Sequence, residues 1–278
     1  STDANPTDIV IDFLTNDKYG LGFPISKIGD LTAFNNYCLA NGILLSPMFD
    51  EQKCGAEHLA DFLKTCNSSF VWSEGKLKII PYGDSQASGN GVTYTPNLTP
   101  IYDLNDDDFV DLEEPIKITR SANADAYNHI KIEFLNRSNA YNAEIAEAKD
   151  LANIDLYGLR PSDTIQMHSI CDATIAKRIA QLMLQRTLYV RNTYEFKTSW
   201  KYCLLEPMDL ITITDSTLGL DKLPVRITEI QEDEEGVLSI KAEEFPFGIA
   251  TASLYPSQNN QGTIVNYYAN PGSINNPV

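Results

Sequence analysis

The chain has 278 residues, of which 43% are hydrophobic and 10% aromatic, so it can bury one sizeable core or two smaller ones. Its formal net charge is −17 and its pI is near 4.5, which excludes nucleic-acid binding through clustered Lys and Arg. No apolar run reaches the length of a membrane span, and the chain does not open with a signal-peptide pattern.

The first hundred residues are predicted to form helices followed by a hairpin. Asn5 is a good N-cap, and Pro6 suits the first turn of a helix over NPTDIVIDFLTN. Two more helices are expected, one capped by Asp30 and one over 55–66. The segment SSFVWSEGKLKII predicts a hairpin that turns at Glu74-Gly75. The span 84–100 is rich in Gly, Ser, Asn and Pro, which predicts a loop.

Strands dominate the second half of the chain. NHIKIEFLNR alternates apolar and polar residues, which indicates a half-solvated antiparallel strand. ICDATIAKRIAQLMLQR predicts one helix, entered through a capping pattern at Ser169 and Asp172. Further strands are expected at TYEFKTSW, MDLITITD, LPVRITEIQ and GVLSIKAEEF. From Tyr255 onward Asn, Pro, Gly and Ser predominate, which predicts a linker or an extended arm.

These elements predict an α+β fold in four parts. Residues 1–102 are expected to form a helical and hairpin subdomain, and 103–115 an acidic connector. Residues 116–247 are expected to form a mostly antiparallel, β-barrel-like domain with one packed helix, and 248–278 an extended linker or arm. Because the chain begins at Ser1 and ends in GSINNPV, we expect it to be a piece of a longer protein.

The acidic connector DLNDDDFVDLEEP raises the question of a calcium site. Five of its residues fall at the ligand positions of an EF-hand loop: Asp103, Asn105, Asp107, Asp111 and Glu114. An EF-hand also needs Gly at the sixth position and a helix on each side. Asp108 occupies that position, and Pro100 and Pro115 flank the loop. The pattern therefore favours a solvated connector over a calcium site.

No side chains in the sequence point to a reaction centre or a cofactor. His58, His129 and His168 are far apart and lack partners at i+3 or i+4. His129 is expected on the polar side of its strand, as a surface imidazole. The five cysteines are widely spaced without a C-x-x-C pair, which disfavours a disulfide framework and fits folding in a reducing cytoplasm. We therefore predict no catalytic residue, no metal site and no cofactor.

The aromatic residues allow two interpretations. Fourteen tyrosines and two tryptophans among many Asn and Asp residues are typical of interfaces and carbohydrate-binding faces. We expect instead that the aromatic residues complete β-rich cores, in particular Trp72, Tyr194, Phe196 and Trp200.

Several segments together resemble one family. NPTDIVIDFLTNDKYGLG and the FNNYC helix are similar to the opening of tail-tip proteins of long-tailed bacteriophages. VWSEGKLKIIPYGD, ADAYNHIKIEFLNRSNAYN, YCLLEPMDLITITD and LPVRITEIQEDEEG resemble the same proteins in order and spacing. About residues 5–247 thus resemble the phage tail proteins of tail tips and baseplate hubs, related to the host-specificity tip protein of lambda-like phages. Met208 departs from the pattern, since related hubs more often have Gly at this turn.

The resemblance implies a structural role and no enzymatic activity. Such hubs are usually trimers that cap the tail tube with barrel domains, adapt it to the tip or spike and later pass DNA. We therefore expect a virion tail protein, made in the bacterial cytoplasm, that binds other tail proteins as a homotrimer. It should neither bind nucleic acid specifically nor span a membrane. An acidic channel would repel DNA phosphates. Because prolines flank the acidic stretch and the EF-hand glycine is missing, we expect Asp103–Glu114 to be a hydrated hinge, or a strap that faces the channel, between the helical unit and the barrel unit.

Two other functions stay open. The chain could be a receptor-binding module that recognises a host-surface glycan through its tyrosines. Less favoured is a tail-associated cell-wall hydrolase, because the sequence nominates no carboxylate pair for it. A contractile injection or secretion spike would have a similar sequence pattern.

Overall fold

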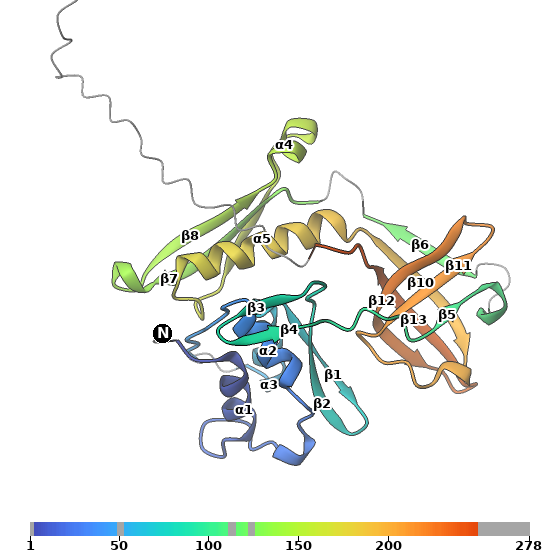
Figure 1. Ribbon diagram of the computed structural model, residues 1–278, viewed down its shortest axis with the longest axis horizontal. Coiled ribbons are helices and arrows are strands. Elements are labelled where there is room, and N and C mark those ends of the chain that lie inside the picture. The colour runs from blue at the N-terminus through green and yellow to red at the C-terminus, as the bar shows by residue number, and fades with distance from the viewer. Residues whose placement is uncertain (1–2, 49–52, 111–114, 122–125, 250–278) are drawn as a thin grey trace, which may run out of the picture.

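The computed structural model describes residues 3–48, 53–110, 115–121 and 126–249. Helices and several sheets are mixed along the chain (Figure 1), which confirms the predicted α and β content. Within these residues no helix is long and apolar enough to cross a membrane.

The N-terminal part contains three helices and two hairpins. The Asn5 side chain accepts a hydrogen bond from the Thr7 N–H at the start of the first helix, as its predicted capping role requires. The first hairpin turns at Glu74-Gly75, as predicted, with φ of 50° and 71°. The elements are α1 (Pro6–Thr15), the short η1 (Ile25–Lys27), α2 (Thr32–Ala40), α3 (Gly55–Thr65), β1 (Ser68–Ser73), β2 (Lys76–Pro81), β3 (Ala87–Gly89) and β4 (Val92–Tyr94).

Two local predictions in this part are wrong. The span 84–100 is not all loop, because β3 and β4 pair within it. They are too short for alternation to be visible, and their turn at Asn90-Gly91 has φ of 49° and 79°, as tight hairpin turns require. Asp30 is not the N-cap of α2, since Leu31 holds that position. The Asp30 carboxylate nevertheless accepts the Thr32 N–H at 2.9 Å.

A three-stranded sheet with a helix on one face follows. Its strands are β7 (His129–Asn136), β8 (Asn142–Lys149) and β9 (Pro161–Gln166), with β7 in the centre, antiparallel to β8 and parallel to β9. The short η3 (Arg137–Asn139) and α4 (Leu151–Tyr157) join these strands, and α5 (Ala173–Tyr189) packs against β7 and β8 (Figure 1).

The start of α5 differs from the prediction. Asp172 is its N-cap, and the Asp172 carboxylate accepts the N–H groups of Thr174 and Ile175. Ser169 lies before the cap, so the predicted Ser169 and Asp172 pattern is wrong. Aspartate and serine are equally good N-caps. The sequence alone therefore does not distinguish a helix that begins after Ser169 from one that begins after Asp172.

The second sheet has six strands in the order β5-β11-β12-β13-β10-β6, all antiparallel except β5 with β11. The four strands predicted after residue 190 are confirmed as β10 to β13. In the described chain β5 and β6 end the sheet and no closed barrel is found, so the barrel prediction is not confirmed. The bounds are β5 (Asp103–Leu104), η2 (Asp106–Asp108), β6 (Ile116–Arg120), β10 (Asn192–Ser199), η4 (Trp200–Tyr202), β11 (Leu210–Asp215), β12 (Leu220–Glu232) and β13 (Val237–Glu244).

Two hydrophobic cores hold these sheets and helices. The first core combines the N-terminal helices and hairpins with β7, β8 and α5. The second core lies under the six-stranded sheet. The predicted packed helix, α5, therefore packs in the first core and not on the six-stranded sheet. The four-part division of the chain stays a prediction.

The aromatic residues divide between the cores and the surface. Tyr194 and Phe196 are buried in the second core, as predicted. Trp72 and Trp200 are 57% and 51% exposed, so the prediction that they complete cores is wrong. Trp72 follows strand alternation, but it lies on the solvent face of the two-stranded β1–β2 hairpin, where it meets Phe23 edge-to-face and stays more than half exposed.

Charged and aromatic side chains join the two cores. Arg186 of α5 donates to both carboxylate oxygens of Glu243 of β13, at 2.8 and 2.7 Å. Its guanidinium lies 4.0 Å from the Tyr82 ring centroid. Arg226 of β12 is buried and lies 4.5 Å from the Phe245 ring centroid and 5.2 Å from that of Tyr82. These cation–π contacts and the ion pair link the end of α5 to the end of β13 in the six-stranded sheet.

The backbone of the turn before β11 shows how the chain accommodates Met208, the residue at which the sequence departs from the family pattern. Met208 has φ of 77°, a left-handed conformation that glycine adopts without strain and other residues do not. Its N–H donates to the Ile227 carbonyl at 2.7 Å. The turn therefore has a backbone geometry that favours glycine, although Met occupies the position.

Candidate functional site

The acidic stretch lies along the six-stranded sheet as an ordered segment, and we call residues 103–110 the strap. At its start β5 pairs in parallel with β11. At its end Phe109 bridges to Thr198 of β10, and the Val110 N–H donates to the Lys197 carbonyl at 3.0 Å. The strap thus crosses from β11 to β10, which β12 and β13 separate in the sheet order.

Two apolar side chains anchor the strap. Leu104 is fully buried and Phe109 is 4% exposed, both within the second core. The Phe109 ring meets Phe196 edge-to-face, with centroids 5.6 Å apart. Asp106 and Asp107 between them are exposed to solvent, as predicted for the connector. Leu104 and Phe109 are buried, so the prediction is wrong for them.

Two strap carboxylates bind side chains of the sheet and its loops. Asp103 accepts the Thr212 hydroxyl and lies 3.7 Å from the Lys222 ammonium. Asp106 accepts the Ser216 hydroxyl at 2.9 Å. These contacts fix the backbone of the strap while most of the Asp103 side chain stays exposed.

Asp108 is the most buried carboxylate of the strap. Its Oδ1 accepts the Tyr202 hydroxyl and the Lys201 ammonium, the latter at 3.2 Å, and its Oδ2 accepts the Asn105 N–H at 3.1 Å. Burial alone would raise the pKa of Asp108, but these three hydrogen bonds outweigh burial and lower the pKa below the ordinary 3.8. Asp108 is therefore held as a carboxylate.

The lowered pKa of Asp108 predicts an acid-dependent stability. A group whose pKa is lower in the folded than in the unfolded state stabilises the fold above its unfolded pKa, and this contribution disappears as the pH falls through the folded pKa. Asp108→Asn should therefore melt below the wild type at pH 7, and the gap should narrow below roughly pH 4. Calorimetric melting temperatures across this range check it. Asp107→Asn, which removes an exposed charge of the same strap, is the matched control, and a gap that stays constant with pH would contradict the assignment.

Three of the five residues of the calcium pattern lie in the strap: Asp103, Asn105 and Asp107. Asp111 and Glu114 lie outside the described residues. Asp103 faces Thr212, and the Asn105 side chain accepts the Asp107 N–H at 3.0 Å as the cap of η2. In the part of the chain that the structure describes, no three His, Cys, Asp or Glu side chains converge as a metal site requires.

The three histidines lie in different surroundings. His129 is only 6% exposed and its Nε2 lies 2.9 Å from a Glu147 carboxylate oxygen. The predicted surface imidazole is wrong, because its strand is central and pairs on both sides there. His58 and His168 line one hollow of about 200 Å³, and His168 Nε2 lies 2.8 Å from a Glu133 oxygen. All five cysteines are free thiols.

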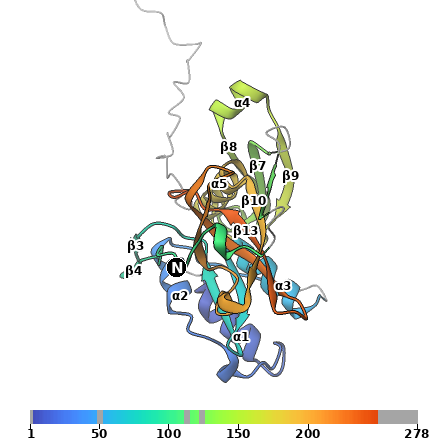
Figure 2. The ribbon, with the colours of Figure 1, turned by 90° about the vertical axis from the view of Figure 1, so that its right-hand side faces the viewer.

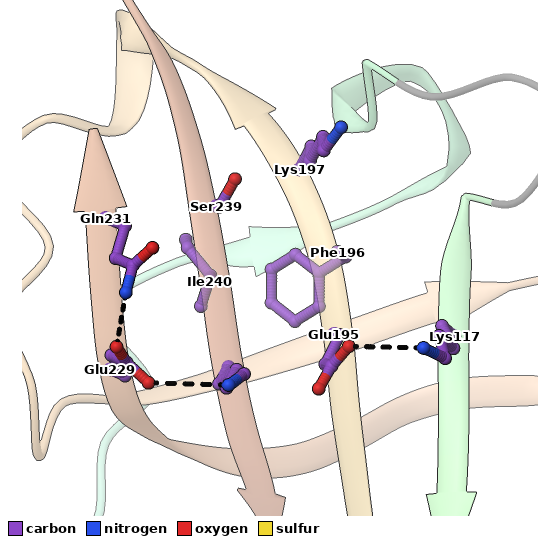
Figure 3. A pocket seen from close by; sticks show the side chains of 9 residues that line it. Lys117, Glu195, Phe196, Lys197, Glu229, Gln231, Ser239 and Ile240 are labelled. Carbon is purple, nitrogen blue, oxygen red and sulfur yellow. Dashed lines mark hydrogen bonds and ion pairs between the residues drawn. The ribbon is translucent and has the colours of Figure 1, made fainter. Parts of the chain in front are cut away.

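The solvent face of the six-stranded sheet carries cross-strand ion pairs around a hollow of about 240 Å³ (Figure 3). Lys117 of β6 lies 3.6 Å from Glu195 of β10, and Lys241 of β13 lies 3.6 Å from Glu229 of β12. Gln231 donates to Glu229 at 2.6 Å. Because these charges alternate and are paired, the face is electrostatically balanced and suits contact without strong attraction for a polyanion.

Comparison with known proteins decides the family. A family model described as "Putative phage tail protein" matches residues 55–230, which is more than half of the chain. The chain belongs to this family. The resemblance to phage tail proteins predicted from the sequence is thereby confirmed, and comparison with curated protein sequences finds no match.

Several solved structures are similar to this phage tail protein at low sequence identity, and two of them, with TM-scores of 0.58 and 0.50, share its fold. A chain of the "Virion of native gene transfer agent (GTA) particle" has 14% identity and a TM-score of 0.58, covering 91% of this chain and 58% of that one. The tail protein from Neisseria meningitidis MC58 has 13% identity and a TM-score of 0.50, covering 82% and 72%. The 43 kDa tail protein of prophage MuSo2 from Shewanella oneidensis has 17% identity and a TM-score of 0.44, covering 74% and 55%. The chain thus spans little more than half of the first and third of these.

Proposed function

We propose that this phage tail protein is a structural, non-enzymatic component of the tail tip, a hub that joins the tail tube to the tip and lines the DNA channel as a homotrimer. The observation that carries the proposal is the strap, a row of exposed carboxylates held rigidly on a sheet in a member of a tail protein family. Similarity in fold to a gene transfer agent virion chain supports it.

The strap suits a surface past which DNA slides. Asp103, Asp106 and Asp107 present carboxylates to solvent, while Leu104 and Phe109 anchor the backbone on either side of Asp106 and Asp107. Carboxylates repel phosphates, so DNA passes without the Lys and Arg contacts that would retain it. We further propose that the six-stranded sheet, with the strap crossing from β11 to β10, is the barrel-like unit that surrounds the channel.

Neutralising the strap tests this function. Particles that carry Asp103→Asn, Asp106→Asn and Asp107→Asn together should assemble normally and release DNA several-fold more slowly, because the channel wall no longer repels phosphates. Dye fluorescence after triggered ejection measures the rate, and added salt should reduce the difference from wild type.

A matched control removes three exposed carboxylates elsewhere on the same sheet. Glu232→Gln, Glu234→Gln and Glu235→Gln lie at the β12–β13 turn and should leave the ejection rate unchanged. Equal rates in all three particles would contradict a strap in the channel. Absence of this chain from purified tails would contradict the structural role itself.

Exposed tryptophans favour one alternative, a module that binds a host-surface glycan. Trp72 and Trp200 lie on different elements and are both more than half exposed, and such rings stack on sugars. Binding of the chain to a glycan array, lost on Trp200→Ala, would support this alternative over the hub.

A further inference from the structure

The tip of one arm of the molecule presents apolar side chains that the described chain does not cover. The arm consists of β8, α4 and the start of β9, and α4 projects away from the N-terminal elements in both views (Figures 1 and 2). Among the described residues no side chain of α4 is buried, and Leu156 is 76% exposed. We call the exposed leucines here the arm patch: Leu151, Leu156 and Leu159.

The arm patch is held in a fixed shape by polar contacts. Asn128 is fully buried beneath it; its side chain donates to Asn153 at 3.1 Å and to the Gly158 carbonyl at 2.7 Å, and accepts the Arg160 N–H at 2.7 Å. Asp150 caps α4 by accepting the Asn153 N–H. A two-turn helix normally depends on burial of an apolar face. Here hydrogen bonds order the helix, so Leu151 and Leu156 stay exposed and preorganised for a partner.

A second apolar patch lies at the opposite end of the molecule, where α1 is found in both views (Figures 1 and 2). The elbow after α1 packs against the β1–β2 hairpin: Phe23 meets Trp72 edge-to-face at 6.2 Å, and the Gly29 N–H donates to the Leu77 carbonyl at 2.8 Å. We call the exposed apolar residues of this elbow and hairpin the elbow patch: Tyr19, Leu21, Ile25 and Trp72.

The charges around the two patches differ. Residues 142–163 around the arm patch hold five carboxylates and two basic side chains. Residues 17–28 and 72–78 around the elbow patch hold four lysines and two carboxylates, and Asp12 and Glu206 also reach this region, where they contact Tyr19 and Lys78. The arm patch is therefore acidic, whereas the elbow patch has as many lysines as carboxylates. Contact between two arm patches would bring like charges together. Contact between one arm patch and one elbow patch brings opposite charges together.

We propose that the arm patch of one copy binds the elbow patch of the next copy. Two different patches on opposite ends give a head-to-tail interface, which closes into a ring when the rotation between copies permits. The proposal rests on the hub function and deepens it, since a ring of copies is what surrounds a channel. Large exposed apolar patches are uncommon on monomers and mark interfaces of this kind.

Cross-linking in assembled particles tests the interface. The background is Cys54→Ser with Cys203→Ser, which removes the two exposed thiols. Leu156→Cys and Ile25→Cys then place one thiol in each patch, at side chains 76% and 70% exposed in the protomer. With a short bismaleimide the variant carrying both thiols should give a ladder of multimers that ends at the ring size, and each single-thiol variant should stay uncross-linked.

Three results would overturn the proposal in particles that contain the chain. These are no ladder from the variant with both thiols, self-cross-linking of a single-thiol variant, or cross-links only to other tail proteins. Each leaves the hub function standing, because that function fails only if the chain is missing from the tail or the strap does not influence ejection.

A charge exchange supplies the test if the cysteine variants do not assemble. Lys27→Glu or Asp155→Lys alone should lower particle yield, since each places like charges at the interface. The two together should restore it. Yield that stays low in the combined variant overturns the proposal.

Discussion

Phe109→Ala is expected to lower the free energy of unfolding by about 4 kcal/mol, the usual cost of truncating a buried phenylalanine. The ring is almost fully buried and meets Phe196 edge-to-face, so its removal leaves a cavity in the second core and deletes an aromatic pair. The same change should release the end of the strap from β10, because only backbone contacts then hold Phe109 beside Thr198.

Urea unfolding and hydrogen exchange separate these two effects of Phe109→Ala. Urea unfolding reports the loss of stability, and faster exchange of the Val110 N–H, which donates to Lys197, reports release of the strap. Val110→Ala is the control, because its exposed side chain should contribute less than about 0.5 kcal/mol. A loss of stability below about 1 kcal/mol in Phe109→Ala would mean that the Phe109 ring contributes little to the second core and does not anchor the strap.

Elements with a strong local signal could be predicted from the sequence. The Asn5 cap, the Glu74-Gly75 turn and the strands β10 to β13 depend on residues within a few positions of one another, and the structure contains them all. The family also followed from the order of several short segments, because order and spacing survive at low identity.

The arrangement of these elements depends on contacts that no local pattern encodes. The sequence favours a solvated connector because prolines flank the acidic residues and the EF-hand glycine is missing, yet the burial of Leu104 and Phe109 anchors this segment on the second core. A signal was present, since two large apolar residues five positions apart interrupt an acidic run. The association of α5 with β7 and β8, and the burial of His129 between two partner strands, arise from pairing across the chain and had no sequence signal.

The arm patch illustrates the converse error of local sequence patterns. Leu151, Leu156 and Leu159 would be assigned to a core by composition, but the structure leaves them in solvent. What distinguishes them is the buried Asn128 beneath α4, whose contacts reach residues 25 to 32 positions away. A local pattern therefore shows that a segment is apolar and not whether its partner lies in the same chain.

Glu243→Gln is expected to lower the free energy of unfolding by about 2 to 3 kcal/mol, because it leaves two arginines at the joint between the cores without their carboxylate. Arg186 loses its ion pair, and its partial exposure limits the cost there. Arg226 is buried; burial lowers its pKa, and the negative charge of Glu243 opposes that effect. Removing the negative charge of Glu243 therefore leaves the buried Arg226 guanidinium without a compensating charge, which destabilises the folded state.

The same substitution at an exposed pair is the control. Glu229→Gln breaks the contact with Lys241 on the solvent face and should cost less than about 0.5 kcal/mol, with the difference vanishing in salt. Urea unfolding at two salt concentrations measures both variants. Arg226→Met supplies the decisive comparison: added to Glu243→Gln it removes the uncompensated buried charge, so the double variant should be more stable than Glu243→Gln alone. If the two losses simply add, Arg226 does not depend on Glu243, and the joint is held by Arg186 and the aromatic rings of Tyr82 and Phe245 instead.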